Sequence, residues 1–145
     1  MKAAGFTLIE LLVVIVIMLG ILLLVPPFFS EGVSGTELKA AARKVAAGLR
    51  KVHAQAVTQK QEAALTLNVE ERRFELTGDK RVYQLPQKID ISLYTAQSEL
   101  SKEKTGAIRF FPDGSSTGGR VTLAAGERKY LVDVNWLTGR VGIIE

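Results

Sequence analysis

The sequence predicts an α+β protein: an N-terminal hydrophobic transmembrane helix, then an amphipathic helix, then antiparallel β-sheets. Three observations lead to this prediction. No charged side chain occurs in the 20 residues from Leu11 to Ser30. Apolar residues then recur at the spacing of a helix, and beyond about Gln61 they alternate as they do in half-buried strands.

The composition excludes several kinds of site. A chain of 145 residues has the length of one typical domain, which leaves no room for a large multidomain enzyme. The absence of cysteine excludes disulfides, thiolate metal cages and a cysteine nucleophile, and one histidine cannot form a His-rich metal site. The formal net charge of +4 permits an acidic partner and does not require one.

The apolar stretch is long enough to cross a membrane. At about 1.5 Å per residue, a helix of its 20 residues spans a hydrocarbon core of roughly 30 Å. A cleaved secretory signal is the alternative, but its apolar region is usually shorter, and no clear small-residue cleavage site follows here. Lys2 is the only basic residue before the stretch, so the positive-inside tendency places the N-terminus in the cytoplasm and the head across the membrane.

Two features distinguish this segment from a plain membrane anchor. Pro26 and Pro27 are expected to end or kink the helix, because proline has no backbone N–H to donate. Glu10 lies among apolar residues, where burying a carboxylate in lipid costs roughly 2.5 to 3.5 kcal/mol on insertion scales. Either Glu10 meets a positively charged partner, or its side chain reaches the membrane interface.

The residues from Gly5 to Glu10, Gly-Phe-Thr-Leu-Ile-Glu, resemble the N-terminal signal of type IV pilins and type II secretion pseudopilins. That signal joins a short basic leader ending in Gly to a Phe-Thr-Leu-Ile-Glu sequence that opens an apolar helix. The resemblance implies that a prepilin peptidase cuts between Gly5 and Phe6 and methylates the new amine of Phe6. It also implies that Glu10 pairs with the N-terminal amine of a neighbouring subunit, and Gly20 and Pro27 match positions where such helices loosen on assembly.

On this resemblance the chain divides into three parts. Residues 1–5 are the prepilin leader peptide, and residues 6–29 form the transmembrane and filament-packing helix. Residues 30–145 form an extracytoplasmic head, with a helix at 35–61 and strands within 63–145. Cleavage on the cytoplasmic side of the apolar helix keeps that helix in the mature protein.

The head is predicted to begin with an amphipathic helix. Ser34 and Glu37 have the spacing of a capping box, in which each side chain satisfies a backbone N–H of the first turn. The basic side chains that lie off the apolar stripe could form a filament surface, a phosphate-binding face or a solvated face, and the solvated face is favoured. The apolar stripe consists of Leu38, Ala41, Ala42, Val45, Leu49, Val52 and Ala56, and the basic residues are Lys39, Arg43, Lys44, Arg50 and Lys51.

Alternating apolar residues then predict short strands, which suggest an antiparallel sheet or two packed sheets. The polar segment Ala96–Thr105 is predicted to be a loop. The predicted strands are Ala64–Val69, Arg73–Leu76, Arg81–Leu85, Ile89–Leu93, Ala107–Phe111, Arg120–Ala124, Lys129–Val134 and Arg140–Ile144.

A second resemblance lies at the other end of the chain. The segments Phe110–Ser116 and Val132–Val141 are similar to the C-terminal region of the type II secretion minor pseudopilin H family and its fimbrial T-like relatives. In those proteins a strand ends in Phe-Pro-Asp-Gly-Ser and a final hairpin closes on Thr-Gly-Arg-Val. With a looser likeness of Leu49–Val57 to the family's helix, the resemblance spans most of the chain.

The polar residues of the head do not form a recognisable reaction site. Asp113-Gly114 could help to bind a cation but is first a turn signal. Ser115, His53 and an aspartate could in principle form a triad, yet no nucleophile elbow surrounds Ser115. Trp136 could be a stacking platform, although a core or hairpin aromatic is the favoured interpretation. No catalytic residue, cofactor site or metal site is therefore expected, and Gly118-Gly119 lacks the residues of a phosphate loop.

The resemblance implies a structural minor pseudopilin of a type II secretion pseudopilus that supports protein export across the outer membrane. The implied location is the bacterial inner membrane, with a single span and the head in the periplasm. The implied partners are the prepilin peptidase, the major pseudopilin and the other minor pseudopilins. The alternative is a minor pilin of a type IV pilus or DNA-uptake filament. Nucleic acid is not the expected partner, but in this alternative the residues that would bind DNA are Arg120, Arg128, Lys129 and Arg140.

Overall fold

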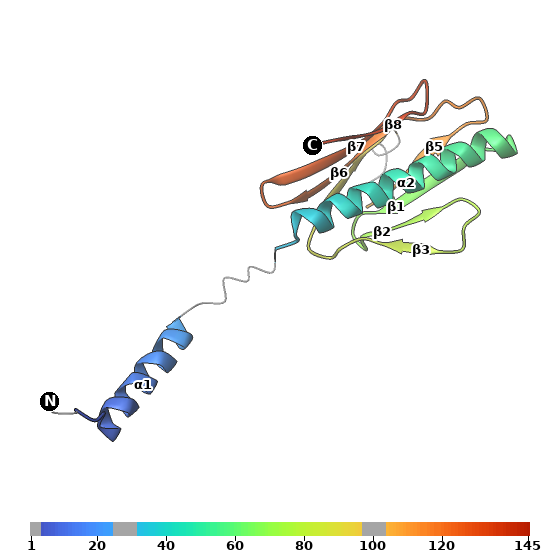
Figure 1. The fold of residues 1–145 in the computed structure, drawn as a ribbon. Coiled ribbons are helices and arrows are strands. Elements are labelled where there is room, and N and C mark those ends of the chain that lie inside the picture. Colours follow the sequence, from blue (N-terminus) through green and yellow to red (C-terminus); the bar gives the residue numbers. More distant parts are fainter. Residues whose placement is uncertain (1–3, 25–31, 97–103) are drawn as a thin grey trace. The chain divides into compact units, whose positions relative to one another are not determined.

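The computed structural model describes residues 4–24, 32–96 and 104–145. They belong to two units, one that ends at Glu31 and one that runs from Gly32 to Glu145 (Figure 1). The N-terminal unit contains helix α1, Leu8–Leu24. In the described parts of the chain, no helix is both long enough and apolar enough to cross a membrane. The helix predicted from the sequence covers residues 6–29, and its part beyond Leu24 lies outside the described residues. Pro26 and Pro27 also lie outside them.

The second unit begins with helix α2, Gly35–Gln59. Ser34 caps it, because its Oγ accepts a hydrogen bond of 3.1 Å from the backbone N–H of Glu37, as the capping-box spacing predicts. Lys60 ends the helix in the left-handed conformation, with φ of 52°. All seven residues of the predicted apolar stripe are buried, so the helical periodicity identifies the face that packs on the sheets.

Among the described residues of the head, eight strands follow α2 and form two four-stranded antiparallel sheets, which confirms the predicted α+β class. One sheet has the strand order β3-β2-β1-β5, and the other has the order β4-β6-β7-β8. Of the predicted loop Ala96–Thr105, residues 97–103 lie outside the described ones. The strands are β1 Ala63–Asn68, β2 Arg73–Leu76, β3 Val82–Gln84, β4 Asp90–Tyr94, β5 Thr105–Phe110, β6 Gly119–Ala125, β7 Arg128–Val134 and β8 Val141–Ile144.

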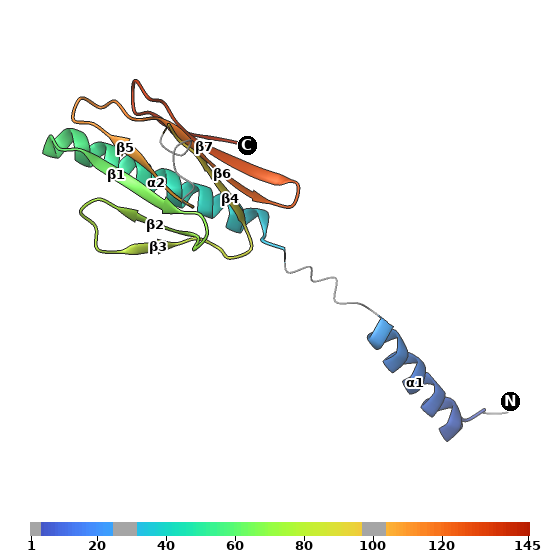
Figure 2. The same cartoon turned by 180° about the vertical axis from the view of Figure 1, so that it is seen from behind.

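Helix α2 runs along both sheets and packs against strands of each (Figures 1 and 2). In the first sheet, Leu67 lies opposite Phe74 and Leu65 lies between Leu76 and Ile108. In β6 and β7 of the second sheet the buried positions alternate along the strand, as expected when one face is covered. The two sheets thus share one apolar core built on the buried face of α2.

Gly48 lets α2 approach the first sheet closely. A Cβ atom built on Gly48 would lie 3.0 Å from Phe74, 3.2 Å from Leu65 and 3.3 Å from Leu76. These distances are shorter than ordinary carbon contacts, and all three neighbours are themselves buried. A larger side chain at this position would therefore push the helix and the sheet apart.

Gly48→Val should destabilise the head by roughly 1–3 kcal/mol, because it overpacks the interface between α2 and the first sheet. Ala47→Val is the matched control, since Ala47 is exposed on the adjacent helical position and valine there costs under about 1 kcal/mol in helix propensity. Urea unfolding of both variants measures the difference. Equal stability of Gly48→Val and the unchanged protein would show that the core has room at Gly48.

Candidate functional site

The N-terminal motif lies at the start of α1. Gly5 and Phe6 precede the helix and are exposed. The backbone N–H of Glu10 lies 3.3 Å from Thr7 Oγ1 and 3.1 Å from the Thr7 carbonyl, so Thr7 caps the helix. This capping role was not predicted from the sequence, although Thr7 and Glu10 have the spacing of a capping box. Glu10 consequently lies in the first turn, where the helix dipole stabilises a carboxylate.

Helix α1 is apolar on every side. Glu10 is the only charged residue among its 17 residues. Its large apolar side chains from Leu8 to Leu23 are 48–88% exposed. A helix that is hydrophobic all round is stable only when lipid or other helices cover it. The apolar surface of α1 in a single chain therefore needs lipid or other helices to cover it.

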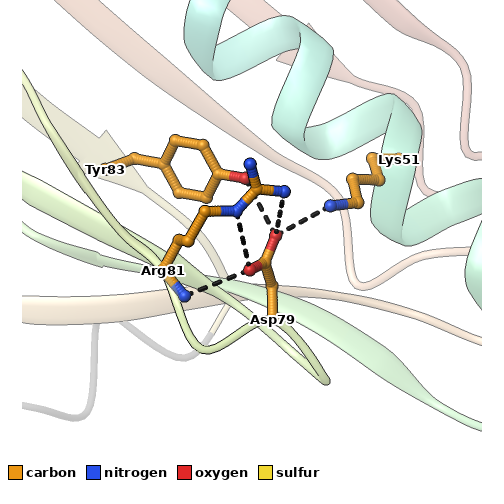
Figure 3. A network of polar contacts seen from close by, with 4 residues as sticks. All are labelled: Lys51, Asp79, Arg81 and Tyr83. Atoms are coloured by element: carbon orange, nitrogen blue, oxygen red, sulfur yellow. Dashed lines mark hydrogen bonds and ion pairs between the residues drawn. The ribbon is translucent and has the colours of Figure 1, made fainter.

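The most extensively hydrogen-bonded carboxylate that the structure describes in the head is that of Asp79, in the turn between β2 and β3 (Figure 3). Asp79 Oδ1 accepts from the backbone N–H and from Nε of Arg81, both at 3.1 Å. Asp79 Oδ2 accepts from Lys51 Nζ at 2.7 Å, from Tyr83 Oη at 2.9 Å and from Arg81 Nη2 at 3.2 Å. Lys51 reaches the carboxylate from α2, whereas Arg81 and Tyr83 belong to the same hairpin as Asp79.

This cluster fastens the β2–β3 hairpin to α2. The hydrogen bonds from Arg81, and then that from Lys51, hold the pKa of Asp79 well below its ordinary value of 3.8. Lys44 Nζ makes a second link from the helix to the same hairpin, because it donates to the Gln84 carbonyl at 2.8 Å. The donors and acceptors satisfy one another, so the cluster acts as a structural contact.

The candidate triad is not formed. His53 Nε2 lies 3.0 Å from the Gly114 carbonyl. Ser115 Oγ instead donates to Asp113 Oδ1 at 2.6 Å, and this contact lowers the pKa of Asp113. Gly114 has φ of 88° and its N–H donates to the Phe111 carbonyl, so the predicted turn at Asp113-Gly114 is confirmed.

The four basic residues proposed for DNA capture do not form one groove. Arg120 pairs with Asp133 at 2.9 Å and lies opposite it in the sheet. Arg128 is five positions from Asp133 along β7, a separation of about 17 Å at 3.4 Å per residue. Lys129 lies beside Arg128 at that far end of the sheet, whereas Arg140 lies in the turn that follows β7.

Trp136 lies in the turn between β7 and β8, as a hairpin aromatic, and 65% of its surface is exposed. The favoured interpretation, a core or hairpin aromatic, is therefore confirmed in the hairpin form and not the core form. The reason is its register: Val134 ends the strand with its side chain buried, and the chain then leaves the sheet. Among the residues that the structure describes, no group of three His, Asp or Glu side chains could hold a metal ion.

Comparisons with known proteins support both the N-terminal and the C-terminal resemblance. Residues 1–25 match the prokaryotic N-terminal methylation motif. Residues 41–139 match the family model described as type II transport protein GspH. The chain belongs to the GspH family. Type II secretion system protein H of Xanthomonas campestris pv. campestris is 33% identical over 137 residues, covering 94% of this chain and 80% of that relative.

Two solved structures share the fold of this GspH-family chain. The minor pseudopilin EpsH of the type 2 secretion system of Vibrio cholerae has a TM-score of 0.59 at 13% identity, covering 74% of this chain and 96% of that structure. The type IV minor pilin FimU of Pseudomonas aeruginosa has a TM-score of 0.59 at 12% identity, covering 76% of this chain and 90% of that structure. The pilin-like architecture predicted for the head is therefore confirmed.

The Asp79 cluster should make the stability of the head sensitive to acid. Because folding lowers the pKa of Asp79, its stabilising effect is fully present above the unfolded value near 3.8 and is lost as the pH falls through the lower folded value. Asp79→Asn should lower the melting temperature at pH 7, and its difference from the unchanged protein should shrink below about pH 4.

Glu75→Gln is the control for this measurement, since it removes an exposed carboxylate from β2 without touching the cluster. Its melting temperature should follow that of the unchanged protein across the same pH series. A difference between Asp79→Asn and the unchanged protein that stayed constant from pH 7 to pH 2 would contradict the proposed ionic role of Asp79.

Proposed function

We propose that this protein is a structural minor pseudopilin of a type II secretion pseudopilus, supporting protein export across the outer membrane. The relatives whose printed names describe a type II secretion protein H and a minor pseudopilin support this role. The observation that carries it in this chain is α1, an exposed helix that is apolar on every side and begins with a methylation motif. Such a helix can be held by lipid before assembly and by other helices afterwards.

Processing and location follow from the same segment. The prepilin peptidase cuts between Gly5 and Phe6, leaving an N-methylated Phe6 at the start of α1. The mature chain is anchored in the inner membrane by residues 6–29 and presents its head to the periplasm. Its partners in the filament are the major pseudopilin and the other minor pseudopilins.

Glu10 gives the assembled helices their register. In the proposed filament, its carboxylate pairs with the N-terminal amine of Phe6 in a neighbouring subunit. Water solvates neither charge at this depth. The assembled filament is therefore most stable when the axial position of each chain brings the carboxylate and the amine together. The Thr7 cap supports this role because it fixes where the helix begins relative to Glu10.

DNA capture is not proposed. Binding to duplex DNA needs several phosphates neutralised together. The candidate residues lie at two ends of the sheet, and Arg120 is already paired with Asp133. The absence of a catalytic role and of cofactors remains a prediction.

Processing can be read from the mass of the protein purified from membranes. We expect an N-terminal peptide that begins with methylated Phe6. Gly5→Leu should abolish this product, because the leader of the signal that this segment resembles ends in Gly. A mature terminus near Gly35 in the unchanged protein would instead identify an ordinary secreted protein.

Glu10→Gln should leave processing and membrane insertion intact, because removal of a charge makes insertion easier. It should lower the yield of cross-links to the major pseudopilin about tenfold or more, since the buried amine of the neighbouring subunit loses its counter-charge. Glu75→Gln serves as control because it removes one carboxylate from the head surface. Unchanged cross-linking of Glu10→Gln would show that the proposed pairing is wrong.

A further inference from the structure

A surface depression of about 400 Å³ lies at one end of the second sheet, where β4 and β7 end and β6 begins. Tyr94, Arg120, Asp133 and Trp136 are among the residues that line it. Tyr94 lies opposite Arg120, and Arg120 lies opposite Asp133, so these three residues form a row across one face of the sheet. Nothing in the proposed filament role uses this row.

Two aromatic rings at this depression are open to solvent. Tyr94 is 66% exposed and Trp136 is 65% exposed. Exposed aromatic rings on one concave surface are typical of binding sites, because each ring offers a large apolar face and a polar edge.

Trp136 is held in place by its backbone. Its carbonyl accepts a hydrogen bond of 2.7 Å from the N–H of Ser116, and its Cβ lies against Gly118, where any added Cβ would be only 3.0 Å away. Asn135 Oδ1 accepts from the N–H groups of Leu137 and Thr138 at 2.9 and 3.0 Å, which closes the turn. A ligand that stacks on Trp136 therefore does not have to order the turn first.

The polar groups of the depression match a neutral ligand. Arg120 Nε donates to Asp133 Oδ1 at 2.9 Å, so the two charges offset each other. Both side chains are still partly exposed, at 49% and 39%, and the pair retains N–H donors and an acceptor oxygen for a ligand. A nucleic acid or another polyanion would need unpaired positive charge here, and a purely apolar segment would leave the remaining N–H donors of Arg120 and the second oxygen of Asp133 without partners.

We propose that this depression binds a neutral glycan. The ring of a sugar has an apolar C–H face, which can stack on Trp136 and Tyr94. Its hydroxyl groups both donate and accept hydrogen bonds, as the Arg120–Asp133 pair requires. The paired charge, the two exposed rings and the hydrogen-bonded turn support this class of ligand. The site is independent of α1, so it does not depend on filament assembly.

Trp136 is the only tryptophan of the chain, so its fluorescence reports on this site alone. The full chain in a polyoxyethylene detergent, whose headgroup contains no sugar, is titrated with chitotetraose and with cellotetraose to about 10 mM. We expect a saturable blue shift with at least one tetrasaccharide, unchanged between 50 and 500 mM salt. The absence of a shift with either sugar would overturn the proposal.

Variants locate the site. Tyr94→Ala and Arg120→Met should each weaken binding about tenfold, which corresponds to the loss of one stacking or hydrogen-bonding group. Leu137→Ala is the matched control, because Leu137 is a similarly exposed apolar residue of the same turn that does not line the depression. Melting temperatures of all three variants verify folding. Equal weakening by Leu137→Ala would indicate a general effect of the turn and contradict the assigned site.

Two further titrations test the competing occupants. A single-stranded oligothymidylate that shifted Trp136 fluorescence with a steep salt dependence would identify a nucleic-acid site and overturn the glycan proposal. A shift seen only when the chain is mixed with the major pseudopilin would identify a subunit interface and overturn it as well. Sugar binding that persists in Glu10→Gln would show that the site acts apart from the filament role.

Discussion

The head depends on one constraint: a single helix must cover two sheets at once. The buried face of α2 meets this constraint with small residues such as Ala41, Ala46 and Gly48, so the strands come close to the helix axis. The sheets supply most of the volume of the core, with Phe74 and Phe110 as its largest buried side chains. In the parts of the head that the structure describes, no other helix covers either sheet, so loss of the α2 contact would expose both.

Polar contacts then hold the edge of this assembly in place. Strand β3 has only three residues, of which none is fully buried, and it forms an edge of its sheet. Lys44 and Lys51 link the β2–β3 hairpin to α2 through the Gln84 carbonyl and Asp79. Lys44 and Lys51 were expected on a solvated face of the helix. They thus also have a structural role, because they attach the hairpin to α2.

The apolar side chains of the N-terminal unit are exposed, unlike the core side chains of the head. The side chains of α1 find no cover in the part of the chain that the structure describes, whereas the apolar face of α2 is fully buried. This contrast is consistent with the proposed role, in which α1 passes from lipid to other helices while the head has a core of its own.

The sequence predicted the elements better than their spatial relations. Periodicity identified α2 and the eight strands that the structure describes, and the uncharged apolar stretch indicated α1, because each signal is local. It could not predict that β1 pairs with β5 or that β4 pairs with β6, since pairing between distant strands depends on the whole core. For the same reason the Asp79 cluster and the depression beside Trp136 were not predicted: each brings together residues from separate elements.

If α1 anchors the chain and packs the filament, its side chains are shielded from water in the cell, while the exposed face of α2 remains accessible. The chain has no cysteine, so single cysteines at Val16 and Ala54 give a direct test with a membrane-impermeant maleimide. In spheroplasts, Ala54→Cys should be labelled rapidly, and Val16→Cys should stay unlabelled both there and in purified filaments. Labelling of both positions at equal rates would contradict the account, because α1 would then be exposed to water.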